Sequence, residues 1–163
     1  MKVLIITYYW PPAGGSGVQR WLKFVKYLQN FDIEPIVYTV DNANYPKEDS
    51  SLLNEVPENI KVLKQPIWEP TDLFFWKKKS EQKKDISNST NSEFLSFIRG
   101  NFFIPDPKVF WVKRSVKFLN NYLKENNVDV IISTGPPHSM HLIAKKLHQK
   151  HRLKWIADLR DPW

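Results

Sequence analysis

The stretch KVLIITYYWPPAGGSGVQRW, residues 2–21, decides the fold. It begins with a run of apolar and β-branched residues, 2–8, which is typical of a strand buried on both faces of a sheet. A helix is expected to begin at Ser16 or Gly17 and to end near Asn30, because apolar residues recur there at helical spacing. A second apolar run, 35–40, predicts another strand. A strand, a helix and a strand at this spacing predict a right-handed crossover and a parallel sheet.

The remainder of the chain repeats the same alternation of strands and helices. Further strands are expected at 59–63, 128–133 and 153–157, and helices at about 107–126 and 138–151. We expect the first of these helices to bury a stripe made of Val109, Val112, Val116, Leu119 and Leu123. The sequence therefore predicts an α/β fold, a Rossmann-like parallel sheet flanked by helices, with residues 1–163 in a single domain. An irregular basic and aromatic insertion interrupts it at about 66–105.

Composition limits the classes of protein that remain open. The chain has 163 residues, 42% of them hydrophobic, which suffices for one buried core. It contains no cysteine, which excludes disulfides and thiolate metal sites. No segment approaches the roughly 18–20 apolar residues of a membrane span, so we expect a soluble, cytoplasmic protein. The net charge of +7 favours anionic partners. Because the chain stops at Asp161-Pro162-Trp163 directly after an apolar segment, we expect the natural protein to continue.

Three segments are predicted to lie at one edge of the sheet. They are the glycine loop after the first strand, STGPPHS at 133–139 after the fourth, and DLRDPW at 158–163 after the fifth. In parallel α/β sheets, ligands bind beyond the carboxyl ends of the strands, where all three segments fall. This shared position makes them the candidate ligand site.

The glycine loop is of a kind that holds phosphate. Glycines allow backbone N–H groups to approach a ligand, and the start of the following helix favours negative charge. A dinucleotide site is favoured by Gly15-Ser16-Gly17 and by Asp41 after the second strand. Arg20 stands where the third glycine of that fingerprint would be, however, and the loop is too long for its tight turn. We therefore expect a phosphate compound other than a nicotinamide dinucleotide, with a plain strand-to-helix turn as the alternative.

The other two segments supply a histidine and a group of charges. Two prolines place His138 near the start of a helix, where it either takes part in the site or caps and packs the helix. His138 and His141 could share a face, but without a nearby third ligand no metal site is expected. Asp158, Arg160 and Asp161 either form a local salt bridge or hold a carboxylate toward a sugar hydroxyl or toward His138.

A basic and aromatic run in the insertion suggests a membrane contact. Apolar rings beside lysines suit the surface of an anionic membrane, and the proposed patch consists of Phe74, Phe75, Trp76, Lys77, Lys78 and Lys79. Packing of these rings on the domain itself is an open alternative. Stacking on single-stranded nucleic acid is a further chemical option, although nucleic acid is not among the expected partners.

The ordered segments PPAGGSGVQR, ISTGPPHSMHLIAKKL and WIADLRDPW resemble the N-terminal domain of GT-B-fold glycosyltransferases of the family-4, retaining type. The last two look like those of bacterial enzymes that build surface polysaccharides. The resemblance covers nearly the whole chain, although residues 45–105 match only in layout. It implies an acceptor-side half of an enzyme that moves a sugar from a nucleotide-diphosphate donor to a saccharide or lipid-linked acceptor with retention. The C-terminal donor-binding domain is absent from these residues, so the chain alone is expected to be inactive.

The resemblance also implies roles for particular residues. Backbone N–H groups of Gly14, Gly15 and Gly17 would line the donor diphosphate, with Arg20 assisting. His138 and Asp161 would be catalytic, and Asp158 and Arg160 would contact acceptor or sugar. No metal or separate cofactor is implied, and the enzyme would lie peripherally at the inner face of the plasma membrane. Two alternatives stay open: a nucleotide-sugar epimerase of the same two-domain architecture, and a non-catalytic anion-binding domain.

Overall fold

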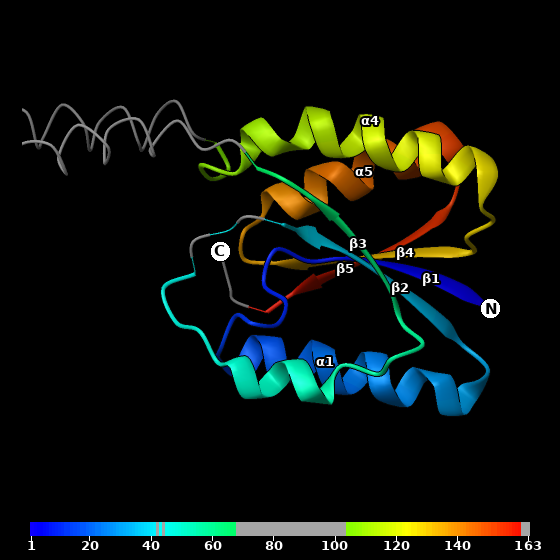
Figure 1. The fold of residues 1–163 in the computed structure, drawn as a ribbon. Helices are drawn as coiled ribbons and strands as arrows, with labels where there is room; N and C mark the ends of the chain where they lie inside the picture. The colour runs from blue at the N-terminus through cyan, green and yellow to red at the C-terminus, as the bar shows by residue number, and fades with distance from the viewer. Residues whose placement is uncertain (42, 44, 68–103, 161–163) are drawn as a thin grey trace, which may run out of the picture.

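The structure, a computed structural model, describes residues 1–67 and 104–160 apart from 42 and 44. In this part of the chain five parallel strands form one sheet in the order β3-β2-β1-β4-β5. The strands are β1 (Lys2–Ile6), β2 (Glu34–Val40), β3 (Lys61–Gln65), β4 (Val130–Gly135) and β5 (Lys154–Leu159). Helix α1 (Ser16–Leu28) covers one face, while α4 (Val109–Glu125) and α5 (Ser139–His151) cover the other (Figure 1). The predicted α/β fold is confirmed. Short 3-10 helices, η1 (Gln29–Phe31) and η2 (Ser50–Glu55), follow α1 and precede β3.

The central strand β1 is buried on both faces, as its apolar run predicted. Val3 and Ile5 belong to the core beneath α1, whereas Leu4 and Ile6 belong to the core beneath α4 and α5. All four side chains are at most 2% exposed. Because successive side chains of a strand point to opposite faces, one short segment supplies both layers of the core.

Helix α4 buries part of the expected stripe together with residues outside it. Val112 and Leu119 are buried as expected, and Trp111 and Ser115 are buried beside them, whereas Val109, Val116 and Leu123 are only partly covered. The indole of Trp111 stacks on the ring of Tyr38 in β2, with ring centroids 5.2 Å apart. The Ser115 hydroxyl is satisfied inside the helix, since it donates to the Trp111 carbonyl at 2.8 Å. A large aromatic contact therefore determines which face of the helix is buried.

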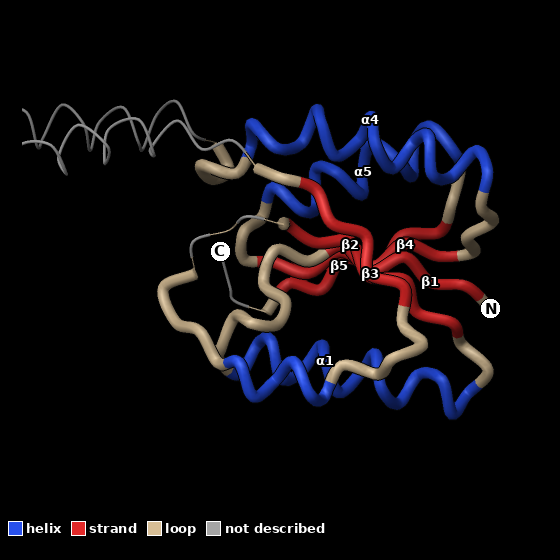
Figure 2. Tube along the Cα trace, viewed as in Figure 1, coloured by secondary structure: helices blue, strands red, loops and turns tan. Residues whose placement is uncertain are grey.

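The carboxyl ends of β1, β4 and β5 lie at the same edge of the sheet, and the loops that follow β1 and β4 lie together there (Figure 2). Helix α1 begins one residue beyond its N-cap, Gly15, so the predicted caps Ser16 and Gly17 instead form its first turn. Among the described residues, no helix has the length and apolar character needed to cross a membrane.

Candidate functional site

Asp158, near the end of β5, connects the three segments that the sequence places at this edge. Its carboxylate accepts hydrogen bonds from both terminal nitrogens of Arg20, at 2.9 and 3.2 Å. It also accepts from Trp21 Nε1 at 3.0 Å and from Thr134 Oγ1 at 2.9 Å. Arg20 and Trp21 belong to α1 and Thr134 to β4. One carboxylate thus ties α1 to two neighbouring strands.

The electrostatics of Asp158 follow from these contacts. Burial by itself raises the pKa of this carboxyl, but hydrogen bonds from Thr134, Arg20 and Trp21 outweigh it and hold the pKa below its ordinary value. The group is therefore ionised at neutral pH, with its oxygens engaged by the protein. The Arg20 guanidinium is held in a bidentate pair, the arrangement in which arginine and carboxylate bind most strongly.

The glycine loop divides into a packed part and an open part. The Gly14 N–H donates to the Lys47 carbonyl at 2.9 Å, so this amide is engaged within the protein and is not free to donate to a diphosphate. Gly15 has φ of +116°, a conformation that favours glycine. After Gly15, the first turn of α1 has no side-chain cap and no acidic residue. The open backbone donors of this loop therefore lie at the start of α1.

Arg160 lies directly against that helix start. A Cβ atom on Gly17 would lie only 1.7 Å from Arg160 Nη1, so the absence of a side chain at Gly17 is what admits the guanidinium. Arg160 Nε donates to the Gly135 carbonyl at 2.8 Å, which fixes the side chain between α1 and β4. Within residues 1–67 and 104–160, excepting 42 and 44, no carboxylate pairs with this guanidinium. A fixed cation and the positive end of a helix dipole thus meet at one point.

His138 and His141 form a pair of rings beside this point. Their centroids are 5.7 Å apart, and both rings approach Gly135, where a Cβ would lie 3.0 Å from His138 Nδ1 and 2.8 Å from His141 Nε2. Burial lowers the pKa of His141, and the neighbouring His138 lowers it further. No set of three histidine, aspartate or glutamate side chains suited to a metal occurs among the described residues.

Asp106, which the sequence reasoning did not single out, occupies the start of α5. Its carboxylate accepts from the Ser139 N–H at 2.7 Å and from the Ser139 hydroxyl at 2.8 Å. It also accepts from the Lys108 N–H at 2.9 Å. The positive end of α5 is therefore already matched by an internal anion. An aspartate directly before a proline and a helix is a turn signal, but nothing in the sequence links it to a helix so far along the chain.

Several of the predicted residues lie outside the described part of the chain. Asp161 is one of them, and so is the whole proposed membrane patch, Phe74 to Lys79. Most of the basic and aromatic insertion, residues 68–103, falls in the same category. Their predicted roles stay predictions.

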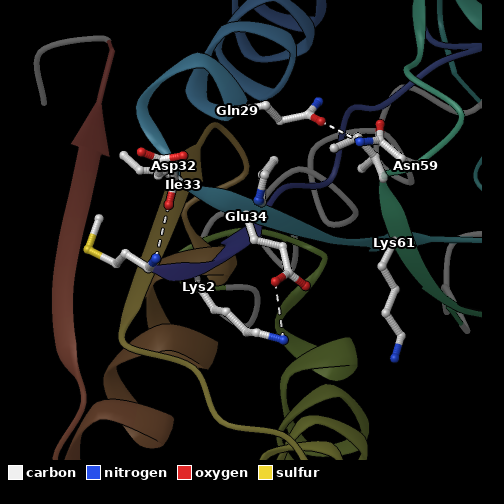
Figure 3. A pocket seen from close by; sticks show the side chains of 10 residues that line it. Lys2, Gln29, Asp32, Ile33, Glu34, Asn59 and Lys61 are labelled. Carbon is white, nitrogen blue, oxygen red and sulfur yellow. Dashed lines mark hydrogen bonds and ion pairs between the residues drawn. The ribbon is translucent and has the colours of Figure 1, made fainter.

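A hollow lies at the opposite edge of the sheet. It lies where β1 and β2 begin, and its lining includes Lys2, Asp32 and Glu34 (Figure 3). Lys2 pairs with Glu34 at 3.2 Å, and the N-terminal amino group donates to the Asp32 carbonyl at 3.0 Å. Because these polar groups satisfy one another and lie away from the strand carboxyl ends, the hollow is the weaker candidate.

Comparison with known proteins bears on the fold alone. No protein-family model and no curated protein matches the chain. Its structure is similar to that of the C-terminal domain of a hydrogenase from Pyrococcus furiosus, with a TM-score of 0.53 and 13% sequence identity. The match covers 97% of this chain and 90% of that one. At this identity the similarity supports an α/β fold and carries no information about activity.

Proposed function

We propose that this chain is the N-terminal, acceptor-side half of a retaining glycosyltransferase, and that the first turn of α1 binds the diphosphate of a nucleotide-sugar donor. One observation carries the proposal: the Arg160 guanidinium lies against Gly17 at a helix start that has no side-chain cap. Both groups favour a negative charge at the same place. The place lies beyond the carboxyl ends of the strands, where ligands of such sheets bind.

The chemistry of sugar transfer explains why such a point is useful. The bond between the anomeric carbon and the diphosphate oxygen breaks, the acceptor hydroxyl oxygen forms a bond to the same carbon, and the hydroxyl proton leaves with the diphosphate. In the transition state negative charge accumulates on the departing diphosphate while the sugar becomes oxocarbenium-like. Backbone N–H groups and a guanidinium that are already in position stabilise this charge without rearranging. His138 lies beside the transferred sugar in this proposal, and Asp161 keeps the catalytic role that the resemblance implies.

In the proposal the two arginines exchange the roles expected from the sequence. Arg160, expected to contact acceptor or sugar, is placed on the diphosphate, because its guanidinium lies over the helix start. Arg20, expected on the diphosphate, supports the site through its pair with Asp158. Of the three glycines, Gly15 and Gly17 keep their role, whereas the Gly14 amide is engaged by Lys47.

A titration monitored by NMR tests the binding part of the proposal. Pyrophosphate and a panel of nucleoside-diphosphate sugars are added to the ¹⁵N-labelled chain. We expect the amide signals of Ser16 and Gly17 to shift. Arg160→Ala should weaken binding about tenfold or more, because a charge-assisted hydrogen bond contributes about 1.5–3 kcal/mol. Arg114→Ala is the matched control, since this exposed arginine of α4 carries the same charge. Equal weakening by the two variants would refute a specific site.

Product analysis tests the reaction class in the longest natural form of the chain. The protein is incubated with a nucleotide sugar, with and without a saccharide or lipid-linked acceptor. Transfer with retained anomeric configuration supports the proposal. Release of epimerised nucleotide sugar without transfer would support the epimerase instead. Binding without either product would support an anion-binding domain.

A further inference from the structure

A partly buried hydrogen-bond chain runs from β5 through β4 to α5 and ends at His141. Trp155 Nε1 donates to Ser133 Oγ at 2.8 Å. The same oxygen lies 2.8 Å from His141 Nδ1. Ser133 is fully buried, so neither contact is replaced by bulk water. The sequence suggested only a metal role for His141 and rejected it.

The direction of this chain follows from the chemistry of its members. An indole nitrogen can only donate, so Ser133 Oγ accepts from Trp155. Ser133 Oγ keeps its own hydrogen for one further bond, and His141 Nδ1 is the ring atom within reach of it. With the serine as donor, neutral His141 carries its ring proton on Nε2, and this is the tautomer that the inference below assigns.

His141 Nε2 lies beside Gly135, next to the His138 ring. This atom is buried and has no hydrogen-bond partner among the described residues. It contacts the open side of Gly135, where an added Cβ would lie 2.8 Å away, with His138 Nδ1 3.0 Å from the same point. The two rings are inclined by 32° and meet over this glycine. The ring of His141 therefore packs beside the ring of His138 and limits how that ring can turn.

Burial favours the neutral form of His141. Burial first, and the adjacent His138 second, lower the pKa of this ring, so both disfavour a positive charge on His141. Asp158, from β5, and Asp106, which caps α5, act in the opposite direction without reversing the shift. A neutral ring held by a buried serine has one fixed orientation.

We propose that His141 is a positioning residue for His138. The hydrogen bonds from Trp155 to Ser133 and between Ser133 and His141 orient the His141 ring, and this ring in turn contacts the His138 ring next to Gly135. This role rests on the proposed function, in which His138 lies beside the transferred sugar. His141 touches no substrate in it. The residue acts by fixing the direction in which the His138 ring faces the site.

Imidazole NMR of the ligand-free chain tests the inference. In the native chain we expect His141 as the tautomer protonated at Nε2. Ser133→Ala should abolish this single-tautomer signature and shift the ring signals of His138. Ser115→Ala is the matched control, because it removes another fully buried serine hydroxyl, bonded within α4, and should leave both rings unchanged.

A second variant separates ring contact from loss of fold. His141→Asn keeps a polar side chain near Ser133 but removes the imidazole ring that packs beside His138. We expect this variant also to shift the His138 ring signals, while its amide spectrum remains that of a folded chain. His138 ring signals that superimpose on the native ones in both Ser133→Ala and His141→Asn would overturn the inference.

A nucleotide-sugar titration of the same variants keeps this inference apart from the proposed function. In Ser133→Ala we expect the Gly17 amide to shift as in the native chain, while the response of the His138 ring is lost. Absence of the Gly17 shift in the native chain would count against the diphosphate site itself. A normal Gly17 shift together with a normal His138 response in Ser133→Ala would count only against the positioning role.

Discussion

Removing the carboxylate of Asp158 should destabilise the chain strongly, because this group satisfies buried donors from two elements. In Asp158→Ala, Trp21 and Thr134, which are 6% and 3% exposed, each lose their acceptor. Leaving a buried donor unsatisfied costs about 1–3 kcal/mol. The Arg20 side chain is 43% exposed. Water replaces most of its ion pair, which is worth at most about 1 kcal/mol at such a surface position.

Together these contributions predict a loss of about 3 kcal/mol in the free energy of unfolding. For a domain of this size, that corresponds to a fall of about 6–12 °C in Tm. Asp158→Asn should lose less, because its amide oxygen still accepts a hydrogen bond. Glu58→Ala, which removes an exposed carboxylate, is the control for the change in net charge.

The assay is thermal and urea unfolding followed by circular dichroism over a range of pH. The folded-state pKa of Asp158 lies below its unfolded value of about 3.9. Its contribution is therefore present above that pH and is lost as the pH falls through the folded pKa. The stability difference between the native chain and Asp158→Asn should accordingly close in acid below about pH 4. An Asp158→Ala variant that melts within about 2 °C of Glu58→Ala, a shift worth less than about 1 kcal/mol, would refute the reasoning.

Three further predictions follow from contacts at the same edge. Gly17→Ala should displace the Arg160 guanidinium and weaken pyrophosphate binding about tenfold, with stability unchanged or raised by about 0.5–1 kcal/mol because alanine favours a helix; unchanged affinity in the titration would contradict this. Asp106→Ala should cost about 1 kcal/mol in urea unfolding, since the Ser139 N–H loses its cap, and a stability equal to that of the native chain would count against the cap. His141 has a folded-state pKa below its unfolded value of about 6.5, so the free energy of unfolding should decline as the pH falls below about 6.5. The decline should be shallower in His141→Asn. An identical dependence of stability on pH in the two chains would argue against a neutral His141 ring.

The fold could be predicted because its strands and helices carry strong local patterns. The run that forms β1 is apolar at every position that meets a helix, and parallel strands force the loops after β1, β4 and β5 to one edge. Spacing predicted Val112 and Leu119 in the buried stripe of α4 but missed Trp111. The area of the Trp111 ring and its stacking on Tyr38 set that face, and this contact joins segments distant in sequence.

The common sheet edge of the candidate segments was predicted from the sequence, but the pairings of their side chains were not. Asp158 meets Thr134 because the two stand opposite one another in the register of β4 and β5, and it meets Trp21 across 137 residues of sequence. No local pattern distinguishes an arginine paired with a carboxylate from one that lies open over a helix start. This difference determines which of Arg20 and Arg160 is assigned to the diphosphate in the proposed function. It depends on the packing of Arg160 against Gly17 and on the ion pair of Arg20, neither of which a local pattern contains.

The cap that Asp106 places on α5 gives this edge of the sheet an electrical polarity. The start of α5 is neutralised by an internal carboxylate, whereas the start of α1 is reinforced by Arg160. For the ligand of the proposed function, which has an anionic diphosphate at one end and sugar hydroxyl groups at the other, this difference favours one direction across the edge. Its charged end is drawn to α1 and its neutral end toward α5 and His138. In the proposed function, this difference between the two helix starts would orient the nucleotide-sugar donor.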